Sequence, residues 1–130
     1  MIQFTDIDGI ILGSIPTLGC DLANLICVYT FINRDAAPNY TELSGCFDRA
    51  IRAGIMEIPT NGRYCLVQEW AQTIQRWIDE AEVSELGIFG FAEWLLTQEW
   101  PEKVKTTFVL HRKDYKKALR GRPVRREVND

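Results

Sequence analysis

The stretch that decides the predicted fold is TELSGCFDRAIRAGIMEIPTNGRYCLV, residues 41–67. Its first half carries apolar residues at helical spacing, and Gly54 is well placed to end that helix in a left-handed conformation. The pattern then changes, because IMEI and RYCLV are rich in strand formers and PTNG stands between them. Asn-Gly readily adopts the positive φ angles of a tight hairpin turn. We therefore predict a helix, a short strand, a turn and a second short strand.

Upstream of this stretch, the chain predicts one short strand and one buried helix. The run DGIILGSIP is apolar between Gly9 and Pro16, which favours the strand. The segment LGCDLANLICVYTFIN, residues 18–33, is apolar almost all round, as expected of a central buried helix. Thr17 is a suitable N-cap for it, and either Asn39 or Thr41 can cap the helix that follows.

Downstream of this stretch, residues 67–81 predict an amphipathic helix and residues 84–100 a second helix that Pro101 ends. KTTFVL, residues 105–110, is strand-like, and RKDYKKALRGR, residues 112–122, predicts a short basic helix.

The helix predicted over residues 84–100 is apolar around nearly its whole circumference. Gly87 and Gly90 lie three residues apart and would permit close approach by another helix. In so small a chain, one face of this helix can exceed what a monomer covers, and large exposed apolar patches usually mark an interface. We therefore predict an interface, with a protein partner or in a homodimer, at these residues: Leu86, Phe89, Phe91, Trp94 and Leu95.

Charge is unevenly distributed along the chain. Residues 1–100 hold 5 Lys/Arg and 14 Asp/Glu, whereas residues 101–130 hold 10 Lys/Arg and 4 Asp/Glu. The two sums, −9 and +6, give the net charge of −3. The protein thus has an acidic body and a basic C-terminal end.

Neither the cysteines nor the single histidine form a recognisable chemical motif. Cys20, Cys27, Cys46 and Cys65 make no C-x-x-C pair, and each lies in an apolar context, which is typical of buried free thiols. His111 has no nucleophile near it in sequence, and no Gly-rich phosphate loop is present. We expect a non-enzymatic protein without a metal or cofactor. The N-terminus lacks the basic start of a secretory signal, and no apolar stretch is long enough for a membrane span, so we expect a soluble, cytoplasmic protein without a membrane partner.

The stretch over residues 41–67, together with the helix before it, resembles the winged helix-turn-helix superfamily. The matching features are Glu42 and Leu43 near the helix start, the Ala53-Gly54-Ile55 exit, the first wing strand at 55–58, the tip at Asn61-Gly62, and the second strand at 64–67. The resemblance implies an α+β, mainly helical fold, with a winged-helix-like core of helices plus a two- or three-stranded wing sheet. We expect residues 1–120 to form this single domain with additional C-terminal helices, and residues 121–130 to be a basic, flexible tail.

Proteins of this superfamily bind DNA or other proteins, and fold alone does not decide between the two. Between Asn39 and Leu66, three arginines are balanced by three acids, which is a poor electrostatic footprint for DNA. We favour protein–protein interaction, as in an adaptor, an antitoxin or immunity-type protein, or an assembly subunit. The alternative is a dimeric transcription regulator that contacts DNA through these cations: Arg49, Arg52, Arg63, Lys113, Lys116, Lys117 and Arg120.

Overall fold

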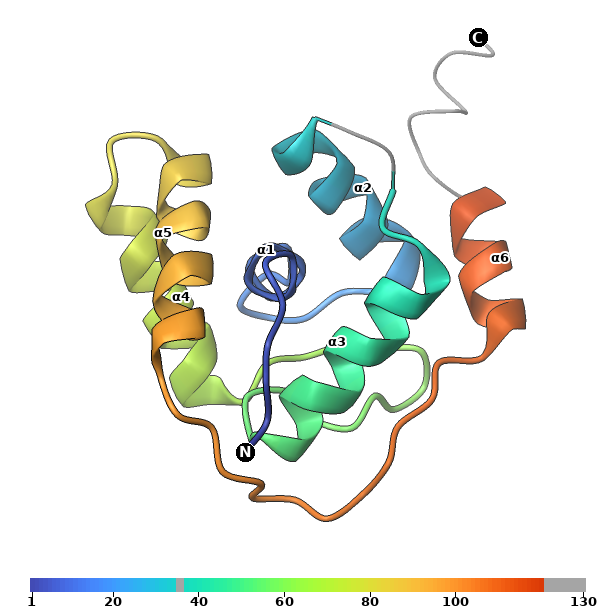
Figure 1. Cartoon of the computed structure of the whole chain (residues 1–130). Helices are drawn as coiled ribbons and strands as arrows, with labels where there is room; N and C mark the ends of the chain where they lie inside the picture. The colour runs from blue at the N-terminus through green and yellow to red at the C-terminus, as the bar shows by residue number, and fades with distance from the viewer. Residues whose placement is uncertain (35–36, 121–130) are drawn as a thin grey trace, which may run out of the picture.

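In the computed structural model, residues 1–34 and 37–120 are described. They form six helices and no sheet (Figure 1). The helices are α1 (Asp8–Gly13), α2 (Leu22–Asn33), α3 (Tyr40–Arg52), α4 (Gln68–Glu80), α5 (Ser84–Thr97) and α6 (Arg112–Arg120). The predicted α+β class, with a two- or three-stranded wing sheet on a winged-helix-like core, is therefore wrong. Residues 121–130, predicted to be a flexible tail, lie outside the described part of the chain.

The segment after α3 makes the predicted turn but not the predicted strands. Asn61 and Gly62 have φ angles of 55° and 72°, and Thr60 and Arg63 exchange backbone hydrogen bonds across them. Farther from the tip, the segment is joined only by an isolated bridge between Met56 and Leu66. Three residues separate Met56 from Thr60, whereas two separate Arg63 from Leu66, so the register shifts by one residue.

Pro59 lies within that shift. Proline has no N–H to donate, and an extra residue in one arm disrupts a ladder as a β-bulge does. These two features explain why residues rich in strand formers make bridges rather than a sheet.

Helix α1 replaces the strand predicted between Gly9 and Pro16, and it lies at the centre of the fold (Figure 1). A Cβ atom on Gly9 would lie 2.3 Å from Ala92 Cα, and one on Gly13 would lie 2.6 Å from Ile88 Cγ2. The two glycines are four residues apart, so they face α5 together and let it approach closely. The Ile-Ile-Leu run between them is fully or almost fully buried, and a short, wholly buried apolar run has the same pattern in a helix and in a strand.

The core joins all these elements. Helix α5 packs against both α1 and α4, and α2 packs against α1 and α6. The largest fully buried side chains come from α1, α2, α3 and α5 and from the segments after α3 and before α6, and they include Ile11, Leu25, Phe47 and Phe91. A cluster of four tryptophans from α4, α5 and the segment after α5 joins this core: Trp70, Trp77, Trp94 and Trp100.

Several predicted helix ends are confirmed. Asn39 caps α3 in a capping box with Glu42, and Gly54, with a φ of 79°, follows its last turn. The predicted cap of α2 is wrong, because Thr17 and Leu18 lie in a turn and Asp21 is the N-cap. That turn is closed by a hydrogen bond from Gly19 N to Pro16 O, with Gly19 at a φ of 82°.

The strand predicted at residues 105–110 is also wrong. Residues 102–110, which we call the strap, make no β-bridge and run alongside α3 before α6 begins (Figure 1). The predicted short basic helix is confirmed as α6. No described helix has the length and apolar character needed to span a membrane.

Candidate functional site

Arg49, the first cation predicted to contact DNA, is bound inside the protein. Its Nε and one terminal nitrogen each lie 2.8 Å from a carboxylate oxygen of Asp8. Asp8 is fully buried, and 22% of the Arg49 side chain is exposed. The hydrogen bond with Asp8 raises the pKa of Arg49. This bidentate pair joins α3 to α1, so Arg49 has a structural role.

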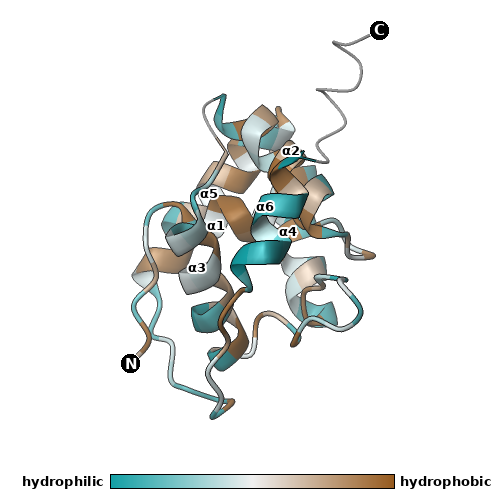
Figure 2. Cartoon of the chain, turned by 90° about the vertical axis from the view of Figure 1, so that its right-hand side faces the viewer, coloured by the Kyte–Doolittle hydropathy of each residue, from teal (hydrophilic) through white to brown (hydrophobic). Residues whose placement is uncertain are grey.

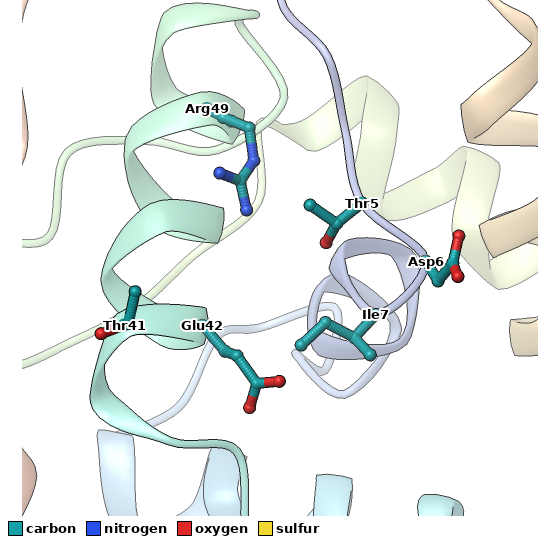
Figure 3. A pocket seen from close by; sticks show the side chains of 6 residues that line it. All are labelled: Thr5, Asp6, Ile7, Thr41, Glu42 and Arg49. Atoms are coloured by element: carbon teal, nitrogen blue, oxygen red, sulfur yellow. The ribbon is translucent and has the colours of Figure 1, made fainter.

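A pocket of about 370 Å³ opens beside this ion pair, between the start of α1 and the side of α3 that faces it (Figure 3). It is lined by Thr5, Asp6, Ile7, Thr41, Glu42 and Arg49. Two of its polar groups already have partners, because Arg49 binds Asp8 and a Glu42 carboxylate oxygen accepts the N–H of Asn39. Neither a thiol, an imidazole nor an amine is among these lining residues.

The other two arginines predicted to contact DNA are also engaged. Arg52 binds Asp48 at 3.1 Å and Glu102 at 3.3 Å. A terminal nitrogen of Arg63 donates to the carbonyl oxygen of Leu18 at 2.6 Å. Arg52 thus holds the start of the strap, and Arg63 holds the turn before α2.

The strap follows a polar stripe on α3. Four residues spaced four apart form this stripe: Tyr40, Ser44, Asp48 and Arg52. The Tyr40 hydroxyl donates to the carbonyl of Leu110, whose own N–H donates to Ser44 Oγ at 3.0 Å. Phe108 N donates to Asp48 Oδ1 at 2.9 Å, and Lys103 N donates to the carbonyl of Arg52 at 2.7 Å.

The strap is anchored at one end by apolar contacts as well. The Phe108 ring meets Phe47 edge-on, with 6.1 Å between ring centroids, and Leu110 is buried. The side of α3 that carries the polar stripe is therefore covered by the protein's own chain.

The five residues of the predicted apolar interface differ in their burial. Phe91 and Leu95 are completely buried in the core, Phe89 and Trp94 are half-buried, and 58% of Leu86 is exposed. Gly87 and Gly90 do allow close approach by another helix, as expected, but that helix is α4 of the same chain, at Trp77 and Ile78. The apolar circumference of α5 is mostly covered within one monomer, between α1 and α4.

The four remaining predicted cations lie together. Lys113, Lys116, Lys117 and Arg120 are all exposed on α6. None of them belongs to an ion pair within the described residues, where every ion pair involves an arginine of α3.

An apolar groove of about 260 Å³, which no sequence pattern indicated, lies between α2 and α4. Its lining residues include Asn24 and Val28 on α2, Ile74 and Ile78 on α4, and Ile15 and Pro16 after α1. Phe31 follows on the same face of α2 and is 75% exposed, and Leu18, beside the lining residue Thr17, is 83% exposed. In the sequence, Phe31 is one more apolar residue of a helix predicted to be buried, so no local signal marks this groove.

The cysteines carry free thiols, as expected, and Cys20 and Cys46 are buried. Burial raises the pKa of the Cys20 thiol to about 11 and that of Cys46 well above its ordinary value. Within the part of the chain that the structure describes, no three His, Cys, Asp or Glu side chains are placed to hold a metal ion together.

Comparisons of the chain with models of protein families, with curated proteins and with solved structures gave no match.

Proposed function

We propose that this chain is a non-enzymatic binding protein that accepts an apolar segment of a partner protein in the groove between α2 and α4. The observation that carries the proposal is an open apolar groove with two large, exposed hydrophobic residues next to it, Phe31 and Leu18. Exposed aromatic side chains beside an apolar depression are typical of protein interaction sites. A groove between helices suits an amphipathic helix, which inserts its apolar side.

The polar groups around the groove indicate the charge of the partner segment. Asp21 Oδ1 accepts the N–H of Asn24, and Asp79 Oδ1 accepts the side-chain amide of Gln75; both Asn24 and Gln75 line the groove. The two carboxylates therefore lie at the rim, on a body whose first 100 residues carry an excess of acids. A partner helix with basic residues flanking its apolar side complements this surface.

The test is affinity capture from the native cell with tagged protein, comparing wild type with a Phe31→Ala/Val28→Thr variant. Exposed Phe31 contributes little to folding, and Val28→Thr, at a half-buried position, places a hydroxyl in the apolar groove wall. We expect a protein partner captured by wild type to be lost from this variant. The matched control is Val109→Ala, which removes another exposed hydrophobic side chain, 62% accessible, from the strap.

Equal retention of every captured protein by wild type, the groove variant and the control would contradict the proposal. Circular dichroism of each variant verifies that the helices are intact, so that a loss of capture reports on the groove.

The alternative function, a DNA-binding regulator that reads DNA with α3, has less support. Arg49, Arg52 and Arg63 are bound to Asp8, to Asp48 and Glu102, and to the turn before α2, and the strap covers the polar stripe of α3. What remains of the predicted DNA-binding set is the group of four cations on α6.

A further inference from the structure

We infer that the outward face of α6 is a contact site for the phosphate backbone of nucleic acid. Four cations form this face, which we call the α6 stripe: Lys113, Lys116, Lys117 and Arg120. Their spacing is i, i+3, i+4 and i+7, so they lie along one side of the helix. Figure 2 shows α6 as a strongly hydrophilic helix on the side of the molecule that faces the viewer.

The opposite side of α6 fixes the direction of the stripe. Ala118 is buried and Tyr115 and Leu119 are half-buried, and α6 packs against α2. The Tyr115 hydroxyl donates to the carbonyl of Pro38 at 2.8 Å, and its ring meets Tyr40 edge-on at 6.0 Å. Because the inner side is held in this way, the α6 stripe points away from the body.

The neighbours of the α6 stripe leave its charge largely uncompensated. Arg112 lies over the Tyr40 ring, 4.1 Å from its centroid, and adds a fifth cation at the start of the helix. Asp114 is the one acid on α6, and it forms no ion pair within the described residues. The stripe therefore presents consecutive positive charges to a ligand.

The dimensions and composition of the stripe favour nucleic acid over a membrane surface. From Lys113 to Arg120 the helix rises about 10 Å, and phosphates of one strand recur about every 3.4 Å along a duplex, so the stripe matches about three or four phosphates. A helix that binds a membrane surface inserts apolar side chains beside its cations. On α6 the apolar side chains are turned into the protein and are not available for insertion.

The uneven charge of the chain also favours binding of nucleic acid at α6. An acidic body repels the phosphates while the basic end attracts them, so nucleic acid is steered to α6 and away from the groove between α2 and α4. This site is independent of the groove and does not rest on the proposed protein partner.

The experiment is fluorescence anisotropy of a short labelled DNA duplex of arbitrary sequence, titrated with the full chain at several salt concentrations. With four phosphates neutralised, log K should fall with log salt concentration with a slope of about −3.6. A Lys113→Gln/Lys116→Gln/Lys117→Gln variant should bind at least about tenfold more weakly at low salt and lower the magnitude of that slope by about 3.

The matched control is Arg76→Gln/Lys103→Gln/Lys105→Gln, which also removes three exposed cations but leaves the α6 stripe intact. It should retain most of the binding. A further variant, Arg122→Gln/Arg125→Gln/Arg126→Gln, tests the cations that follow α6 in the sequence.

Three results would overturn the inference. The first is no binding of the duplex at low salt, and the second is an equal loss in the stripe variant and in the Arg76/Lys103/Lys105 control. The third is loss only in the Arg122/Arg125/Arg126 variant. Two competitor results would overturn nucleic acid as the ligand class. One is that poly-glutamate displaces the labelled duplex as strongly as unlabelled duplex does at equal charge concentration. The other is that the chain binds anionic phospholipid vesicles as strongly as it binds the duplex at equal charge concentration.

Discussion

The guanidinium of Arg49, on α3, closes over the fully buried carboxylate of Asp8, on α1, with two N–O distances of 2.8 Å. Asp8 also accepts the N–H of Thr5, and its carbonyl oxygen receives a contact from the thiol of Cys46. One carboxylate thus organises the start of α1 and fixes it to α3.

Replacing Arg49 with Met should leave this carboxylate buried without its partner. Breaking a buried ion pair from one side typically costs about 3–5 kcal/mol, and we expect a loss of this size in the free energy of unfolding. Urea unfolding followed by circular dichroism measures it. Arg76→Met, on the exposed face of α4, is the control and should stay within about 0.5 kcal/mol of wild type.

Adding Asp8→Asn to Arg49→Met should recover part of the loss, because the buried charge disappears. A single Arg49→Met variant within about 1 kcal/mol of wild type would show that Asp8 is not the buried charge described above.

The two glycines of α5 should respond differently to alanine. A Cβ on Gly87 would lie 2.4 Å from the carbonyl oxygen of Trp77 and 2.7 Å from Ile78 Cα, so α4 and α5 must separate. We expect Gly87→Ala to lower the free energy of unfolding by about 1–3 kcal/mol. Gly90 faces only ring carbons of Trp77, at 3.1 and 3.2 Å, and that side chain can shift.

Gly90→Ala should therefore be nearly neutral, because alanine regains about 1 kcal/mol of helix propensity. Thermal unfolding of both variants checks the contrast. Equal destabilisation by the two substitutions would mean that the backbones of α4 and α5 are not in close contact at Gly87.

The stability of the fold should decline in alkaline solution. Burial raises the pKa of Cys20 from its ordinary value of 9.0 to about 11 and that of Tyr64 from 10.0 to about 12. Above about pH 9 the unfolded chain loses these protons before the folded chain does, so the unfolded state gains stability as pH rises. The contribution of Cys20 is complete below pH 9.0 and is lost as the pH approaches about 11.

Urea midpoints measured from about pH 8 to about pH 11 should fall, and Cys20→Ala should reduce the steepness of the fall whatever its effect at neutral pH. A flat profile over this range would indicate that the two groups are exposed to water.

Features that depend on neighbouring residues could be predicted from the sequence. The Asn39 capping box, the end of α3 at Gly54 and the turn at Asn61-Gly62 each follow from a few consecutive side chains. The basic character of α6 is likewise local. The sheet predicted over residues 55–67 does not form, because pairing depends on register across Pro59, where one extra residue interrupts it.

Features that depend on distant partners were inaccessible from the sequence. Arg49 has the spacing of a groove-reading residue, but its partner Asp8 lies 41 residues earlier, in a segment whose apolar pattern fits helix and strand equally well. Arg52 similarly meets Glu102 at a separation of 50 residues. The groove between α2 and α4 is lined by three separate segments, so no local pattern marks it.

The strap covers the polar stripe of α3, and amide hydrogen exchange followed by NMR tests this arrangement directly. We predict slow exchange at Phe108 and Leu110, whose N–H groups donate to Asp48 and Ser44, and faster exchange at Val109, whose N–H makes no hydrogen bond within the described residues. Ser44→Ala should accelerate exchange at Leu110 first, and Asp48→Ala should accelerate it at Phe108 first. If Phe108 and Leu110 exchange as fast as Val109 in the wild-type protein, the strap is detached and α3 presents its stripe to solvent, which would contradict the account.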